Sequence, residues 1–83
     1  MRNDKENIIV NKTFEFALNI IEFSEQLYKV NKYSLGNQIF KSGTSIGANV
    51  RGAQNAESKA DFIHKIKIAA KEADETEYWL YFV

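Results

Sequence analysis

The sequence predicts an all-α protein, an antiparallel up-down bundle of helices joined by short turns. The 83-residue chain contains no proline, so no position is barred from a helix interior on that ground. Hydrophobic residues make up 45% of the chain and recur at steps of three and four, the spacing of one helix face. Three such runs, separated by short polar clusters, predict three helices within one small domain that spans residues 1–83.

The first helix is predicted over residues 11–31, after a flexible or frayed segment 1–10. It carries two apolar stripes. The first stripe is Phe16, Ile20, Phe23, Leu27 and Val30. The second is Phe14, Leu18, Ile21 and Tyr28, roughly 100–140° further round the helix. An apolar surface this wide exceeds what one neighbouring helix covers, so we expect the first helix to touch two sets of partners.

The second helix is predicted over residues 35–54, with Ser34 as its N-cap. Leu35, Ile39, Ser42, Ile46, Val50 and Ala53 lie along one side, and Gly36, Phe40, Gly43 and Gly47 form a second line. A glycine in a helix interior costs about 1 kcal/mol relative to alanine, so this line predicts close approach of a neighbouring helix. The alternative is a kink or loop at residues 42–45.

The third helix is predicted over residues 58–83 and opens with a capping box, Ser58 to Asp61. Seven apolar residues of the three helices are expected to form the core: Phe16, Ile20, Phe23, Ile46, Phe62, Ile66 and Leu80. No glycine, asparagine or proline closes the apolar end of this helix. We therefore expect an oligomer or exchanged-helix contact there, against another copy or a further segment of the polypeptide, through Trp79, Leu80, Phe82 and Val83.

The composition argues against an enzyme. There is no cysteine, which excludes disulfides and thiolate metal sites, and one histidine, His64, gives no paired metal-binding motif. We find no oriented base for a nucleophile and no phosphate-binding glycine loop. The sequence therefore predicts no catalytic residue, metal, cofactor or small-molecule substrate. Because so small a domain is only marginally stable alone, and disulfides and a metal are excluded, oligomerisation is the compensation that remains.

Charge is segregated although the net charge is zero. Residues 27–71 carry eight basic and two acidic side chains, whereas residues 72–83 carry four acidic and no basic ones. A basic middle segment predicts either solvated helix faces or contact with nucleic-acid phosphates. The candidate phosphate-binding residues are Lys41, Arg51, Lys65, Lys67 and Lys71. No signal-peptide pattern and no membrane-spanning stretch is seen, so we expect a cytoplasmic protein without membrane contact.

Several linked motifs resemble a known bacterial family. They are K-S-G-T-S-I-G-A-N-V at 41–50, A-Q at 53–54, E-S-K-A-D-F-I-H-K at 57–65, A-A-K-E at 69–72, E-T at 75–76 and Y-W-L at 78–80. Over residues 12–83 the chain is similar to the four helix bundle proteins, also called 23S rRNA-intervening sequence proteins.

That resemblance implies a cytoplasmic, non-enzymatic bundle that assembles as a ring-like homo-oligomer, typically a pentamer. A relative, the accessory variability protein of diversity-generating retroelements, binds nucleic acid and works with a reverse transcriptase, which implies such a role as the alternative function. Two departures stand out. Members often have acidic residues where this chain has Arg51 and Gly52. Members also continue into a fourth helix, so the resemblance implies a C-terminally truncated member with three helices of a four-helix bundle.

Overall fold

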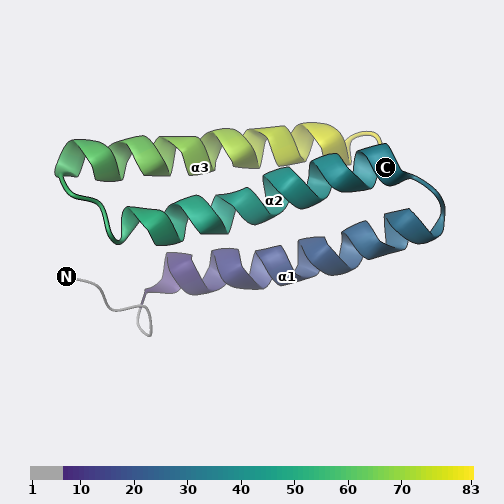
Figure 1. Cartoon of the computed structure of the whole chain (residues 1–83), viewed down its shortest axis with the longest axis horizontal. Helices are drawn as coiled ribbons and strands as arrows, with labels where there is room; N and C mark the ends of the chain where they lie inside the picture. The colour runs from purple at the N-terminus through teal and green to yellow at the C-terminus, as the bar shows by residue number, and fades with distance from the viewer. Residues whose placement is uncertain (1–6) are drawn as a thin grey trace.

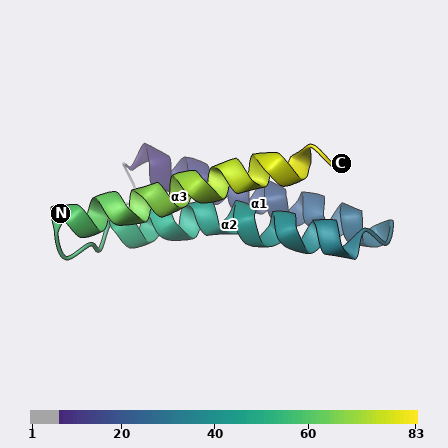
Figure 2. The same cartoon turned by 90° about the horizontal axis from the view of Figure 1, so that it is seen from above.

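Three antiparallel helices build the protein: α1 (Ile8–Lys29), α2 (Tyr33–Ala53) and α3 (Lys59–Leu80). The structure is a computed structural model that describes residues 7–83. α2 lies between α1 and α3 and packs on both, whereas within the described residues the backbones of α1 and α3 do not meet (Figure 1). The overall dimensions are 44 × 23 × 15 Å. The three helices lie side by side with α2 in the middle, and α1 and α3 slope in opposite directions across it, so they form an open, splayed layer (Figure 2).

This architecture confirms the all-α antiparallel prediction. A fourth helix is not among the described residues, so the four-helix bundle stays a prediction.

The start of α1 is fixed by Asn7. Its side-chain Oδ1 accepts a hydrogen bond from the backbone N–H of Val10 at 3.2 Å, and its Nδ2 donates to Oε1 of Gln54 at 2.9 Å. One side chain therefore caps α1 and ties it to the end of α2. Consequently α1 begins at Ile8 rather than residue 11, and what was predicted for residues 1–6 lies outside the described residues.

The turn between α1 and α2 is tighter than predicted. Asn31 has a φ of 66°, the left-handed conformation that asparagine tolerates, and the Lys32 N–H donates to the Leu27 carbonyl at 2.9 Å. The chain reverses so quickly that α2 starts at Tyr33. The N-cap position therefore falls on Lys32, whose side chain makes no capping hydrogen bond, and the prediction of Ser34 as the cap was wrong.

α2 runs without interruption through residues 42–45, so the alternative of a kink or loop there is excluded. The glycine line lies against α1, as predicted from close approach. A Cβ atom on Gly47 would stand 3.1 Å from the backbone carbonyl oxygen of Thr13, and one on Gly43 would stand 2.7 Å from Cγ1 and Cγ2 of Ile20. Glycine is therefore what lets the two helices pack backbone to backbone.

The start of α3 confirms the predicted capping box with one difference. Ser58 Oγ accepts from the Asp61 N–H at 3.0 Å, but the Asp61 carboxylate reaches back to the N–H of Glu57, at 3.2 Å. That hydrogen bond, followed by the contact with Lys65, lowers the pKa of Asp61 below its usual value. At the other end α3 stops at Leu80, and residues 81–83 continue in turns rather than in the helix that was predicted to residue 83.

Two clusters form the core along α2. The first contains Val10, Val50 and Ala69, with Ile46 and Ile66 packed against it. The second contains Ile20, Leu27 and Ile39, with Phe23, Leu35 and Trp79 packed against it.

The predicted core was right for Ile20, and for Phe23, Ile46 and Ile66 as half-buried members. It was wrong for Phe16, Phe62 and Leu80, which remain 38%, 42% and 39% exposed. All three lie on the predicted inward-facing stripes, on the side of the layer between α1 and α3, which we call the groove. The heptad pattern identified an inward-facing stripe, but nothing in the structure covers it.

Two buried serines allow a matched test. Ser42 Oγ accepts from Thr76 Oγ1 at 2.9 Å and donates to the Gln38 carbonyl at 2.9 Å, whereas the Ser24 hydroxyl finds no partner among the described residues. We expect Ser42→Ala to cost about 0.5–1.5 kcal/mol of unfolding free energy, and Ser24→Ala to be neutral or stabilising because it removes an unsatisfied buried group. Urea unfolding of both variants measures this, and an equal loss in the two would contradict it.

Candidate functional site

α1 and α2 together present a face on the side of the layer opposite the groove. We call it the outer face. It comprises Phe14, Leu18, Ile21 and Glu25 of α1 and Phe40, Thr44, Ala48 and Arg51 of α2. Phe14 and Phe16 are two residues apart and so point about 160° apart round α1. The second apolar stripe therefore emerges on this face, where Phe14 is 53% and Leu18 52% exposed. The second set of partners expected for this stripe stays a prediction.

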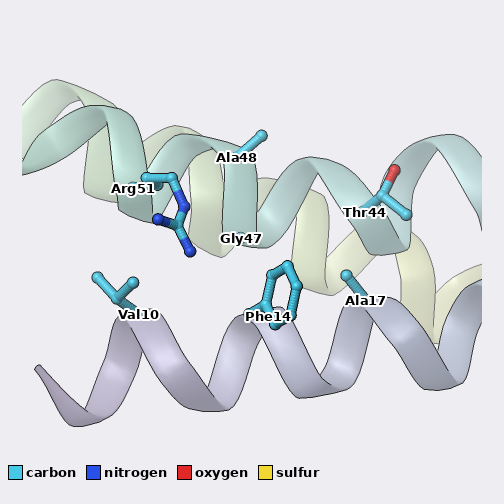
Figure 3. Close-up of a pocket in the computed structure, with 7 residues that line it drawn as sticks. All are labelled: Val10, Phe14, Ala17, Thr44, Gly47, Ala48 and Arg51. Atoms are coloured by element: carbon cyan, nitrogen blue, oxygen red, sulfur yellow. The ribbon is translucent and has the colours of Figure 1, made fainter. Parts of the chain in front are cut away.

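A pocket of about 280 Å³ lies on the outer face in the seam between α1 and α2 (Figure 3). Val10, Phe14 and Ala17 line it from α1, and Thr44, Gly47, Ala48 and Arg51 from α2. The space exists because small residues stand where α2 passes α1. Neither Ala17 nor Ala48 was predicted as a pocket residue; the signal for Ala48 was the mostly small residues of 42–48, which do not include Ala17.

The residues that line this pocket are suited to binding rather than to catalysis. The Arg51 guanidinium lies over the Phe14 ring, 5.8 Å from its centroid, a cation–π arrangement (Figure 3). The Thr44 hydroxyl donates to the Phe40 carbonyl at 2.7 Å, and no base activates it. The pocket can therefore hold an apolar group, with a positive charge at its rim.

A second pocket, of about 310 Å³, lies where the start of α2 meets the end of α3. Its lining residues are Ser34, Leu35, Gln38, Trp79 and Phe82. Tyr78, Trp79 and Phe82 form an aromatic cluster beside it, with ring centroids 5.1 to 6.2 Å apart.

The four residues predicted to make an oligomer contact therefore fall into two groups, one packed and one exposed. Trp79 packs on the core cluster of its own chain, whereas Leu80, Phe82 and Val83 are exposed by 39%, 57% and 56%. Their contact with another copy stays a prediction.

The five candidate phosphate-binding residues do not gather into one band. The Lys65 side chain packs beside Gly52 of α2, and its Nζ forms an ion pair with Asp61 Oδ1 at 3.2 Å. Arg51 lies on the outer face. Lys67 follows Lys65 by two residues and so points about 160° away from it. Lys67 and Lys71 are exposed and share one face of α3, while Lys41 is exposed on α2.

Other chemistry finds little support in the part of the chain that the structure describes. No group of three or more His, Cys, Asp or Glu side chains there is arranged to hold a metal ion. Across residues 7–83, no helix has the length and apolarity to cross a membrane.

The fold and these surfaces define the class, an all-α helical-bundle protein with exposed apolar faces. The chain belongs to the 23S rRNA-intervening sequence protein family, whose sequence profile matches residues 5–83. This confirms the resemblance carried by the motifs.

Among solved structures, the chain is similar to a protein of unknown function from the S23 ribosomal protein family of Bacteroides thetaiotaomicron. The two are 49% identical with a TM-score of 0.86, and the match covers 89% of this chain and 69% of the other. No curated protein matches the chain. Membership therefore establishes fold and family, and the function has to be argued from the surfaces.

Proposed function

We propose that this protein works by self-assembly, as a cytoplasmic helical-bundle module that forms a homo-oligomer and catalyses no reaction. The observation that carries the proposal is the apolar surface on both faces of the layer. Phe14 and Leu18 are exposed on the outer face, and Phe16 and Phe62 in the groove. Monomeric proteins rarely expose contiguous apolar patches of this kind, which are typical of interaction sites.

The openness of the fold explains why this surface exists. An open layer of helices has two broad faces. The side chains of α1 and α3 are covered mainly where these helices pack on α2. Among the described residues seven apolar side chains are buried, three in each cluster together with Ala53, which makes a small core. Apolar area buried against another copy contributes about 25 cal/mol for each Å², from which the entropic cost of association is subtracted. Assembly would therefore supply stability that the isolated layer lacks.

The expected result is an oligomer in solution. Light scattering on a sizing column, repeated over a dilution series, should give a mass that is a multiple of the 9.6 kDa chain. The pentamer implied by the resemblance would show five times that mass. A chain that stays folded and monomeric at the highest concentration would contradict the proposal.

The alternative function is nucleic-acid binding, as an accessory protein with a reverse transcriptase-type partner. Lys67 and Lys71, exposed on one face of α3, are the observation that favours it. If this is the function, Lys67→Glu with Lys71→Glu should weaken binding to single-stranded RNA and lower the magnitude of the salt slope of log K by about 1.4. Fluorescence anisotropy measures both. Lys29→Glu with Lys32→Glu is the matched control, and equal effects of the two pairs would contradict site-specific phosphate contact.

A further inference from the structure

We infer that the pocket on the outer face receives the Tyr78 ring of a second copy, so that α3 of one copy lies along the seam between α1 and α2 of the next. The inference rests on the proposed self-assembly and names the two surfaces that perform it. Because the pocket and Tyr78 are different parts of the chain, the contact is heterologous, and each copy gives one ring and receives one. Repeated contacts of this kind close into a ring when the rotation between neighbours divides a full turn.

Tyr78 projects from a part of α3 that its own chain leaves uncovered. The side chain is 54% exposed, and it points about 160° away from the buried Thr76 round the helix. Its ring meets those of Trp79 and Phe82 edge to face, with centroids 5.1 and 5.2 Å apart. These contacts already restrict the ring, so less side-chain freedom is lost when it docks. Tyrosine also suits an interface, because its ring is apolar while its hydroxyl can bond water or a polar neighbour.

The pocket offers a site of matching size. It has a volume of about 280 Å³, and its lining residues include Phe14, Ala17 and Ala48 (Figure 3). A volume just below the roughly 300–1,000 Å³ of drug-sized ligand sites suits a single aromatic side chain. Phe14 is 53% exposed, so its ring can stack on the entering ring or meet it edge to face. The small side chains of Ala17 and Ala48 let a third helix approach the seam closely.

Charged residues flank Tyr78 in a fixed order. Asp74 stands about 6 Å before it along α3 and Lys71 about 10 Å before it. Both lie within about 40° of Tyr78 round the helix, one on either side. On the outer face, Lys41 of α2 stands about 7 Å from the middle of the pocket, on the side of the α2 start.

The position of Glu25 on the outer face follows from the contacts of α1 with α2. Tyr28 packs on Gly36 and Ile20 packs on Gly43. Glu25 therefore stands level with the part of α2 between these two glycines, about 10 Å from the middle of the pocket. It lies on the same side of the pocket as the α2 start, and so as Lys41, but on the other helix of the seam.

The two sets of charges are complementary when α3 lies parallel to α2 of the next copy. Asp74 then meets Lys41, and Lys71 meets Glu25. All four side chains are exposed, and none of them forms an ion pair with another residue of the described range 7–83. Sliding α3 by about one turn in either direction would set like charges together, Lys71 against Lys41 or Asp74 against Glu25, so the charges also select the register. The opposite direction would carry Lys71 and Asp74 away from both partners.

A charge exchange tests this contact. Lys41→Glu alone and Asp74→Lys alone should each raise the dissociation constant of the assembly at least about tenfold, and the double variant should restore the parent value. Sedimentation velocity over a dilution series measures the constant. Lys59→Glu, the same substitution at the other end of α3, is the control and should leave the constant unchanged. Circular dichroism melts of each variant show that it is folded.

A mixture of two variants tests the pocket. Ala48→Glu places a carboxylate where the Tyr78 ring of the other copy should sit, and Tyr78→Ala removes the ring, so each variant alone should be monomeric where the parent is assembled. An equimolar mixture should form a dimer of twice the 9.6 kDa chain, because the Ala48→Glu chain keeps its tyrosine and the Tyr78→Ala chain keeps its pocket. Ala70→Glu on exposed α3 is the control for an added charge and should assemble like the parent.

Loss in the single charge variants without recovery in the double variant would overturn the inference, and so would a mixture that stays monomeric. An oligomer whose mass neither Ala48→Glu nor Tyr78→Ala changes would also overturn it, and that result would leave the proposed self-assembly intact. A monomeric parent would overturn both.

Discussion

Replacing Ile39 with alanine is expected to remove most of the stability of this protein. The side chain is fully buried at the middle of the layer, where it packs with Ile20 and Leu27. Truncation of such a residue costs about 2–5 kcal/mol, since the lost transfer free energy is joined by the cost of a cavity. A domain of this length has roughly 4–12 kcal/mol in total. Urea unfolding followed by circular dichroism should show the transition midpoint of Ile39→Ala fall steeply.

Leu80→Ala is the matched control, because it deletes the same number of carbon atoms from another helix. Leu80 is 39% exposed beside the open groove, so its loss should cost about 1 kcal/mol in the monomeric chain. The two variants should be compared at a concentration where assembly is absent, because a second copy that covered the groove would bury Leu80. A cost at Leu80 equal to that at Ile39 would contradict the open-layer arrangement.

The contrast between Ile39 and Leu80 shows how much of the fold was accessible from the sequence. Both residues lie on predicted apolar stripes, and the stripes correctly predicted three antiparallel helices. Leu80 was predicted for the core and is exposed, whereas Ile39 was not named for the core and is fully buried. A stripe shows the direction in which its side chains point, but not whether another helix packs against them. That depends on the relation of α1 to α3, two helices whose backbones both pack on α2 and do not approach each other within the described residues. Periodicity therefore predicted the helices well and the burial at the groove poorly.

The predictions of the helix ends also succeeded in some cases and failed in others. Ser58 was identified as a cap from local sequence, because the partner of its hydroxyl lies three residues along the chain. Asn7 was missed because half of its role is a hydrogen bond to Gln54, 47 residues away. Ser34 was chosen for its residue type, but the left-handed Asn31 shortened the turn and moved the helix start ahead of it. Local signals sufficed only where the partner was local.

The candidate surface was predicted in part. The second stripe of α1, Phe14 and Leu18, correctly indicated an apolar face beyond the one that packs on α2. The pocket itself depends on Ala17 and Ala48 from two helices meeting in register, which no pattern within one helix reveals. The prediction of a basic band failed for the opposite reason. They are close in the sequence, yet a helix sends Lys65 and Lys67 in nearly opposite directions.

Two glycines of α2 should respond to the same substitution with opposite signs. Gly43→Ala is expected to destabilise the protein by about 1–3 kcal/mol, since the new methyl group would stand 2.7 Å from Cγ1 and Cγ2 of Ile20. Those atoms lie next to the stiff branch point of a buried side chain, so the helices would have to separate. Gly52→Ala should instead stabilise by about 0.5–1 kcal/mol, because its nearest side-chain neighbour, Lys65 Cδ, is 3.7 Å away.

The pair isolates helix contact from helix propensity. Both glycines lie within α2 at ordinary negative φ, so alanine improves the intrinsic propensity at each site. Nine residues apart, they point in opposite directions, Gly43 to Ile20 of α1 and Gly52 to Lys65 of α3. The difference between the two unfolding free energies therefore measures how closely α1 and α2 must approach. If Gly43→Ala raised the melting temperature as Gly52→Ala should, the close packing of Ile20 of α1 against Gly43 would be refuted.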